Sequence, residues 1–296
     1  MSAYALSLRM RARAARILIA LASLGPPEFE RQARYLLTQH TLGHFRHPRT
    51  FSEKVNWRIL YDRREILADT CDKLRAKERA ERLGVAVPKT LWFGTDLAEL
   101  ATVPLPARWV LKPNHGSGNV YFGYGPVADL AHLRSETRGW LRDSYAARSG
   151  EWAYTRARRG FIVEERLGPK DEAPRDYKFF VFDGEPAVIS VEVDRMTNWC
   201  RRMYTPNWEP LTVRLGLGSR IRPLAGVEDK PATLPAMVRA ARALGQGFDF
   251  LRIDLYSDGN QVYFGELTPY PGGGLARFWP RDYDSELGSR WILPAV

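Results

Sequence analysis

The sequence predicts an α+β fold in which most strands pair in antiparallel fashion. Two pairs of β-rich runs flank residues that favour tight turns, as in hairpins: 176–182 with 186–193 around Asp183-Gly184, and 251–256 with 261–267. Apolar residues at helical spacing occur in residues 52–61 and 237–244, the second segment stopping at Gly245. We therefore expect an α+β chain, with a hinge between two lobes at residues 160–167.

Local signals mark where other elements begin and end. A helix is expected from Asp72, which can cap it, to Arg82, with Gly84 just past its end. After Pro88 the pattern changes to short β-rich runs: residues 108–111, 119–122 and 161–163. No repeat or low-complexity tract interrupts the chain, which indicates one continuous fold.

The composition favours a folded protein with an anionic partner. The 296 residues are 45% hydrophobic and 26% charged, and the formal net charge is +10. Such a charge attracts nucleotides, acidic sugars, anionic lipids or nucleic acid, although it says nothing about the fold. The two cysteines, Cys71 and Cys200, cannot form a disulfide framework and lack the spacing of a zinc site.

The amino-terminal residues combine arginine with an apolar run. The arginines are Arg9, Arg11, Arg13 and Arg16, and the apolar run, residues 17–22, is too short to span a bilayer. The apolar residues that can share one side of a helix are Leu6, Met10, Ile17, Leu18, Leu21 and Leu24. We interpret this segment as a helix packed on its own domain; a membrane-surface or partner-binding helix is the alternative.

Residues 111–120 have the parts of a phosphate-binding loop. A strand ends at Lys112, and a loop with Gly116 and Gly118 leads into the next strand. Lysine supplies a compact cation, and glycine lets backbone N–H groups approach phosphate oxygens. No helix with a GKS or GKT start follows, so the segment is not a P-loop. An ordinary glycine hairpin is the alternative.

Two acids lie on paired strands near the carboxyl end of the sequence. The predicted hairpin of residues 251–267 brings Asp254 close to Glu266. Two like charges among apolar residues are costly to bury unless a divalent cation binds between them, and oxygen ligands suit Mg²⁺. The alternative is a surface hairpin whose acids pair with an arginine such as Arg252.

Charged residues also occur at the centre of the sequence. Glu164 and Glu165 end a strand, where acids and free backbone groups can recognise an adenine edge and a ribose; a solvated loop would have the same sequence. Asp176 and Lys178 alternate with apolar neighbours and therefore point to the same face of a strand.

The succession of these motifs resembles the ATP-grasp superfamily. In order they are Asp72-Lys73, Leu111-Lys112 with its glycine loop, Glu164-Glu165-Arg166-Leu167, Asp176-Tyr177-Lys178, Arg252-Ile253-Asp254 and Glu266-Leu267-Thr268. The phrases FSEKVNWRILYDR, VLKPNHGSG, RDYKFFVFDGEP and YFGELTPYPGGG are similar to the TupA-like ATP-grasp proteins, which are associated with bacterial surface polysaccharide and teichuronopeptide synthesis. The likeness runs from about residue 49 to residue 291.

The resemblance implies an ATP-grasp fold, with two α+β lobes whose largely antiparallel sheets grip ATP. The division that we expect is an Arg-rich helical segment (1–48), an amino-terminal or central part (49–106), a glycine-lid lobe (107–166) and a carboxyl-terminal lobe with the metal site (167–296). The implied nucleotide-binding residues are Lys73, Lys112, His115, Gly116, Ser117, Gly118, Glu164, Glu165, Leu167, Asp176 and Lys178.

The resemblance also implies a metal site and catalytic residues. Asp254, Glu266 and Thr268 match the Mg²⁺ ligands, although Thr268 stands where the superfamily commonly has Asn, which weakens the expected metal binding. Arg252, Lys112 and Lys178 take the catalytic positions around the transferred phosphate. The substrate-binding residues that we expect are Arg195, Arg202, Pro271, Gly272, Gly273 and Gly274.

The expected activity is an ATP- and Mg²⁺-dependent carboxylate–amine ligation through an acyl phosphate. The implied partners are ATP, an acidic sugar or glycan carboxylate and an amino-acid amine, and nucleic acid is not expected. The implied location is the cytoplasm, with peripheral association at the inner membrane through the amino-terminal helix as an option. Two alternatives stay open. A phosphotransferase has similar lysines and metal acids, but no HRD-type loop occurs, and a noncatalytic polyanion-binding module needs only the basic charge.

Overall fold

The Asp183-Gly184 dipeptide forms the tight turn that the sequence predicts. Both residues have positive φ, 47° and 79°, as a type I′ turn requires. The turn joins β5 (Asp176–Phe182) to β6 (Glu185–Val193), and the later predicted hairpin forms from β11 (Phe250–Ser257) and β12 (Val262–Thr268). Both predicted hairpins are therefore confirmed.

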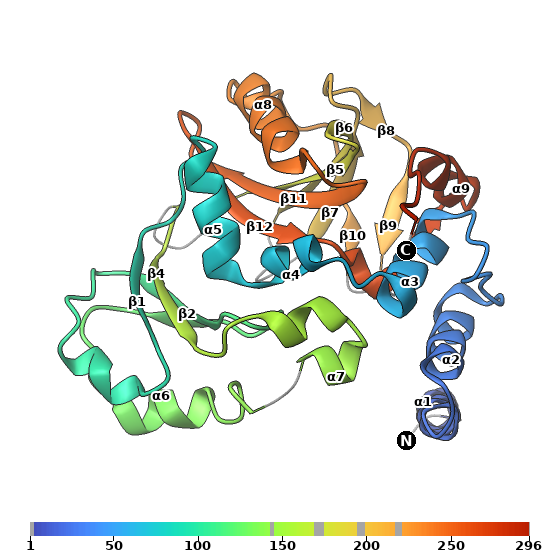
Figure 1. Cartoon of the computed structure of the whole chain (residues 1–296), viewed down its shortest axis with the longest axis horizontal. Helices are drawn as coiled ribbons and strands as arrows, with labels where there is room; N and C mark the ends of the chain where they lie inside the picture. Colours follow the sequence, from blue (N-terminus) through green and yellow to red (C-terminus); the bar gives the residue numbers. More distant parts are fainter. Residues whose placement is uncertain (1–2, 143–144, 169–174, 194–198, 217–220, 296) are drawn as a thin grey trace. The chain divides into compact units, whose positions relative to one another are not determined.

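The structure is a computed structural model that describes residues 3–142, 145–168, 175–193, 199–216 and 221–295 (Figure 1). The chain divides into two units. Unit 1 comprises Met1–Asp62, Leu215–Arg220 and Tyr270–Val296, and unit 2 comprises Arg63–Arg214 and Ile221–Pro269. In the described part of the chain, each helix is too short or too polar to cross a lipid bilayer.

Unit 2 contains two sheets, a larger one of seven strands and a smaller one of four. The larger sheet has the order β10-β7-β6-β5-β11-β12, with β8 paired to β7. Its other strands are β7 (Cys200–Tyr204), β8 (Pro210–Leu211) and β10 (Arg222–Pro223). Every pair in it is antiparallel except β10 with β7. The predicted largely antiparallel sheet is confirmed.

The two faces of the larger sheet differ because side chains alternate along each strand. On β5, Tyr177, Phe179 and Val181 share one face, and Asp176 and Lys178 share the other. Helix α8 (Leu234–Gly245) packs on the apolar face, where a Cβ at Gly245 would meet Val181. In Figure 1, α8 lies on one side of this sheet and the cyan helices α4 (Glu65–Cys71) and α5 (Lys73–Arg82) lie on the other.

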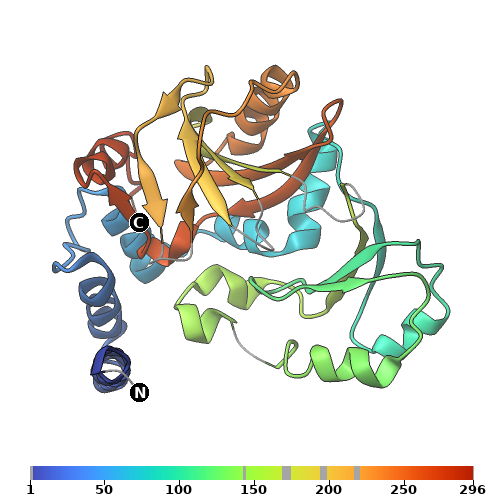
Figure 2. The ribbon, with the colours of Figure 1, turned by 180° about the vertical axis from the view of Figure 1, so that it is seen from behind.

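The smaller sheet has the order β1-β4-β2-β3 and is antiparallel throughout. Its strands are β1 (Thr90–Gly94), β2 (Trp109–Pro113), β3 (Tyr121–Gly123) and β4 (Phe161–Glu165). Trp109 and Leu111 enter a small apolar core, so the alternation along β2 turns Lys112 to the opposite face. The short helices around this sheet are η1 (Leu97–Ala101), α6 (Leu130–Glu136), α7 (Tyr145–Ser149) and η2 (Trp152–Arg156), and Figure 2 shows them from behind.

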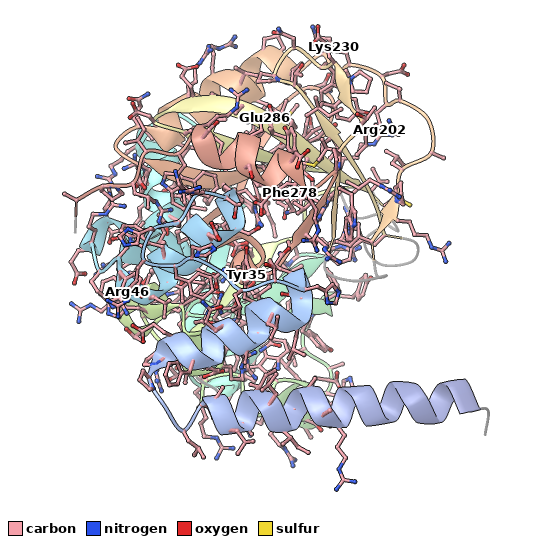
Figure 3. All side chains as sticks on the ribbon, turned by 90° about the vertical axis from the view of Figure 1, so that its right-hand side faces the viewer. Tyr35, Arg46, Arg202, Lys230, Phe278 and Glu286 are labelled. Carbon is pink, nitrogen blue, oxygen red and sulfur yellow. The ribbon has the colours of Figure 1, made fainter. Side chains whose placement is uncertain are left out.

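Unit 1 is mainly helical. Its elements are α1 (Ala3–Ala22), α2 (Pro27–Gln39), α3 (Phe51–Tyr61), η4 (Pro271–Gly274), β13 (Arg277–Trp279) and α9 (Asp282–Ser289), and β13 pairs with β9 (Arg214–Gly216). Thr50 and Glu53 form a capping box at the start of α3, the helix predicted at residues 52–61. Figure 3 shows α1 beside α2, with the labelled Tyr35 on α2.

Helix α1 forms as expected, but its apolar residues do not pack as we interpreted them. Ile17 and Leu21 are 51% and 62% exposed, and Leu24, which follows the helix, is 84% exposed. The helix does pack on its own domain, against α2, as we interpreted it, but these residues are not the ones that it buries. Leu6 and Met10 lie where the structure describes only the backbone.

Asp72 fixes the start of α5 and with it the position of Lys73. The Asp72 carboxylate accepts hydrogen bonds from the backbone N–H groups of Leu74 and Arg75, each at 3.1 Å, so the predicted cap is confirmed. It also accepts from the Arg158 backbone and guanidinium at 2.8–2.9 Å. Burial alone would raise the pKa of Asp72, but the hydrogen bonds from Arg158 and the helix start lower it to about 2.

We expect Asp72→Asn to lower the free energy of unfolding at pH 7 by roughly 2 kcal/mol, because Asn keeps the cap but loses the charge pairing. The pKa of the folded-state carboxyl is below its ordinary value of 3.8. Its contribution is therefore present above pH 3.8 and is lost as pH falls toward 2. Urea unfolding at pH 7, 4 and 3 measures this, and the difference from wild type should shrink across the series.

The matched control is Asp69→Asn. Asp69 is also paired with an arginine, Arg75, but its side chain is 58% exposed. We expect a change within about 0.5 kcal/mol. Equal effects of the two substitutions would contradict the special role of Asp72.

Candidate functional site

A pocket in unit 2 brings together charged side chains from four elements. Lys73 and Lys77 come from α5, Lys112 from β2, Glu164 from β4 and Glu266 from β12. Apolar residues complete the lining, among them Ala76, Phe264 and Leu267. Segments far apart in the sequence thus place three lysines and two glutamates around one opening.

Lys73 connects the glycine loop to the hairpin of the two acids. Its ammonium donates a hydrogen bond to the Gly116 carbonyl and lies 3.9 Å from Glu266 Oε1. Burial lowers the pKa of Lys73, and the charge of Glu266 opposes that shift. The site therefore holds Lys73 in contact with both parts that the sequence predicted for nucleotide and metal binding.

Lys112 is bound to Glu164, which is itself shared. Lys112 Nζ lies 2.5 Å from Glu164 Oε2, and Lys77 Nζ lies 2.8 Å from Glu164 Oε1. Burial alone would raise the pKa of Glu164, but Lys112 and then Lys77 outweigh it and keep the pKa below its usual value. The structure thus places the Glu164 carboxylate between two cations.

The glycine loop follows β2 directly. The side chain of Asn114 accepts from the Leu74 N–H at 3.1 Å and donates to the Arg158 carbonyl at 2.8 Å, which ties the loop to α5. Gly118 has φ +90°, a conformation that L side chains rarely adopt. His115 is buried, and burial lowers its pKa, so it is neutral near pH 7. Ser117, between the two glycines, is half-buried.

The end of β4 lies next to the residue that precedes β1. Glu165 pairs with Lys89 twice, through its backbone N–H at 3.0 Å and through Oε1, which accepts from the Lys89 N–H at 2.8 Å. Leu167 is half-buried. The side chain of Glu165 is therefore engaged with the backbone next to β1.

The two predicted metal acids face each other across a strand pair. Asp254 and Glu266 are direct partners in the register of β11 and β12, and a bulge follows at once, where Gly265 has no partner. A Cβ at Gly265 would lie 2.9 Å from the Asp254 carbonyl oxygen. The bulge needs glycine at this position, and it keeps Glu266 opposite Asp254.

Asp254 lies within a network of buried charges. It accepts from Arg252 at 2.7 and 2.8 Å and from Lys178 at 2.6 Å. Arg252 also donates to Thr268 Oγ1 at 2.9 Å. The pairing with Arg252 that the sequence offered as an alternative is therefore present. Burial alone would raise the pKa of Asp254, but Arg252 and Lys178 hold it well below its usual value.

The polar face extends from Asp254 across the sheet. Lys178 lies 2.5 Å from Asp176 and 4.0 Å from Glu192, and Glu192 accepts from Arg201 at 2.9 Å. Burial alone would lower the pKa of Lys178, but Asp176 and Asp254 raise it above its usual value. The structure thus brings together Asp176 and Lys178, as their alternation predicted.

Three residues of this site were missed in the sequence. Lys77 is one helical turn after Lys73, a spacing that points both to one side of α5. Glu192 is a charged residue in the apolar run of β6 and the cross-strand partner of Asp176. The helical spacing of Lys77 and the charge of Glu192 within an apolar run were the signals that the sequence offered. Arg158 gave none, because its contact with Asp72 joins residues 86 positions apart.

The side chains fit a magnesium ion by their chemistry. Asp254, Glu266 and Thr268 offer only oxygen ligands, and Asp254 is ionised at neutral pH. Among the described residues no group of three or more His, Cys, Asp or Glu side chains forms a metal site. Two carboxylates are nevertheless enough for an ion that takes further ligands from phosphate and water.

The predicted substrate residues fall in both units, and one of them lies outside the described residues. Arg195 lies outside the described residues, and Arg202 is half-buried and donates to the Leu224 carbonyl at 2.8 Å. Residues 271–274 belong to unit 1. There the Gly274 carbonyl accepts from Asn56 at 2.9 Å and the Gly273 carbonyl accepts from Arg31.

Comparison with solved structures finds ATP-grasp ligases at low sequence identity. D-alanine–D-alanine ligase from Bacillus anthracis, complexed with ATP, is 15% identical, with a TM-score of 0.42 over 75% of this chain. The Helicobacter pylori D-alanine–D-alanine ligase is 13% identical, with a TM-score of 0.44 over 77%. The VanG D-Ala:D-Ser ligase from Enterococcus faecalis is 13% identical, with a TM-score of 0.43 over 75%.

This chain covers 63%, 60% and 61% of those three chains, less than two thirds of their length. No curated protein matches it. The profile of the family described as TupA-like ATPgrasp matches residues 53–292, most of the sequence. The chain therefore belongs to the TupA-like ATP-grasp family.

Proposed function

We propose that this protein is an ATP-dependent carboxylate–amine ligase that attaches an amino acid or peptide to an acidic surface polysaccharide or its precursor. The observation that supports it best is the pocket that Lys73, Lys112 and Glu266 share. Two lysines beside a metal-binding carboxylate are the groups that a nucleoside triphosphate needs. Membership of the ATP-grasp family supports the same reaction class.

In the proposed reaction, a carboxylate oxygen of the substrate attacks the γ-phosphorus of ATP, and the bond to the ADP oxygen breaks. The amine nitrogen then attacks the acyl carbon, phosphate leaves, and the amine gives up a proton. Lys73 and Lys112 bind phosphate oxygens and offset their negative charge. Arg252 and Lys178, on the polar face beside Asp254, stabilise the anion that develops at the acyl phosphate.

Magnesium, when bound through Asp254, Glu266 and Thr268, supplies positive charge for the phosphates. Glu164, Glu165, Leu167 and Asp176 hold the adenine and ribose, and residues 115–118 cover the phosphates. Within unit 2, Arg202 binds the acidic sugar by charge pairing. We assign the reaction to the cytoplasm, which supplies ATP.

The first test compares Lys112→Ala and Glu266→Ala with wild type. Each substitution should reduce amine-dependent ADP release by at least a hundredfold, because each removes charge from the phosphate site. Both variants should stay folded, since Lys77 still pairs with Glu164 and the Glu266 side chain is 29% exposed. Measurement combines a coupled ADP assay, in a screen of amino acids against uronic-acid donors, with mass spectrometry of the product.

Lys89→Ala is the control, because Lys89 is an exposed lysine and its side chain does not line the pocket. Wild-type turnover in both site variants would refute the site. A stable phosphorylated product in place of an amide would instead indicate a phosphotransferase.

A second prediction separates the two metal acids. Asp254→Ala should lower the free energy of unfolding by about 3–5 kcal/mol, because Lys178 and Arg252 would keep buried charges without their shared partner. Glu266→Ala should cost at most about 1 kcal/mol. Guanidinium unfolding of both variants measures this, and a larger loss in Glu266→Ala would contradict it.

We also propose that α1 contacts an anionic membrane surface. Ile17 and Leu21 on α1, with Leu24 just past its end, follow one exposed ridge at spacings of four and three residues. Arg13 and Arg16 lie on the same segment, and no acidic residue precedes Glu28 in the sequence. An apolar ridge flanked by arginines is typical of helices that lie in the membrane interface.

Vesicle co-sedimentation tests this contact. Leu21→Asp should reduce binding to phosphatidylglycerol vesicles by at least fivefold, because an acid on the ridge removes apolar burial and repels anionic lipid. Ser23→Asp adds the same charge one position away from the ridge and should reduce binding less than twofold. Equal losses in the two variants, or no binding by wild type, would reject the ridge as a membrane contact.

A further inference from the structure

Lys77 lines the same pocket as Lys73 and Lys112, but its ammonium has no N–H left for a ligand. It donates to the Pro88 carbonyl, to Thr90 Oγ1 at 2.6 Å and to Glu164 Oε1 at 2.8 Å. A lysine ammonium has three N–H groups, so these acceptors use all of them. Lys77 is therefore held by the protein on every side.

Glu164 joins this fixed lysine to a more accessible one. Its side chain is 3% exposed, Lys77 is 7% exposed and Lys112 is 23% exposed. One carboxylate oxygen binds Lys77 and the other binds Lys112. The position of the Lys112 ammonium thus depends on Glu164, whose own orientation depends on Lys77.

We propose that Lys77 is a positioning residue, which fixes the Glu164 carboxylate so that Glu164 holds the Lys112 ammonium at the nucleotide phosphates. The proposal deepens the proposed function and rests on one part of it, the binding of ATP at Lys112. Lys77 itself does not touch the nucleotide.

The charges around Glu164 make this role measurable by pH. Lys112 on β2 and Lys77 on α5 lower the pKa of Glu164 against the effect of burial. Lys73 and Glu266 are the other charged groups that line the pocket. Removal of Lys77 leaves one of the two cations, so the pKa of Glu164 rises. Protonation of Glu164, and with it the loss of ordered Lys112, then begins at a higher pH.

The experiment is a double-mutant cycle of Lys77→Met and Glu164→Gln, read by calorimetric titration with ATP and MgCl₂. Lys77→Met should weaken ATP binding about tenfold and shift the acid limb of binding to higher pH. If the effect passes through Glu164, adding Lys77→Met to Glu164→Gln should change the affinity less than twofold. In turnover, KM for ATP should rise while kcat changes less than about threefold, because ground-state binding is lost.

Lys89→Met is the matched control, since it removes a lysine charge outside the pocket and should leave affinity and pH profile unchanged. If Lys77→Met does not fold, Lys77→Gln, which keeps an N–H donor without the charge, carries the same expectation. Wild-type ATP affinity in a folded Lys77 variant overturns the proposal, and so does a penalty that adds in full to that of Glu164→Gln. Absence of ATP binding by wild type overturns it too, whereas ATP binding without amide formation refutes only the ligase reaction.

Discussion

The buried Asp254 carboxylate is the group on which the rest of the site depends. Without it Arg252 and Lys178 would both lose a buried partner, although Lys178 would keep Asp176, and together the two cations hold the pKa of Asp254 low enough for it to stay ionised. Removing one partner from such a cluster leaves an uncompensated charge, which is far more costly than the pairing itself is favourable. The cluster therefore fixes the polar face of the larger sheet as a unit.

Strand alternation explains why these charges share one face. Along β5 the apolar side chains pack beneath α8, which leaves Asp176 and Lys178 on the other side. On β12, the bulge at Gly265 sets the register that puts Glu266 opposite Asp254. A one-residue slip would turn the acid toward the wrong face. Backbone geometry thus decides where the acids lie before any ligand contributes.

Local signals were enough to predict much of this fold. The Asp183-Gly184 turn, the Asp72 cap and the pairing of Asp254 with Glu266 each depend on residues that are near in sequence or lie in one hairpin. Lys77 was missed because its partner Glu164 is 87 positions away, and no periodicity encodes such a contact. Helix α1 packs on α2 as expected, but Ile17 and Leu21 stay exposed, because apolar spacing indicates a face but does not say what covers it.

The three lysines of the pocket differ in the exposed fraction of their side chains, and this fraction indicates the role of each. Lys77 is almost fully buried and its three N–H groups are engaged, so its ammonium binds groups of the protein rather than a ligand. Lys73 and Lys112 are 15% and 23% exposed and are paired with carboxylates that an incoming phosphate resembles in charge and in acceptor geometry. In the proposed function, a phosphate therefore takes over the contact that Glu266 makes with Lys73 and adds a contact to Lys112, which stays bound to Glu164. In the proposed function, the cost of assembling these cations is met in folding, which leaves the binding energy of the nucleotide free for the reaction.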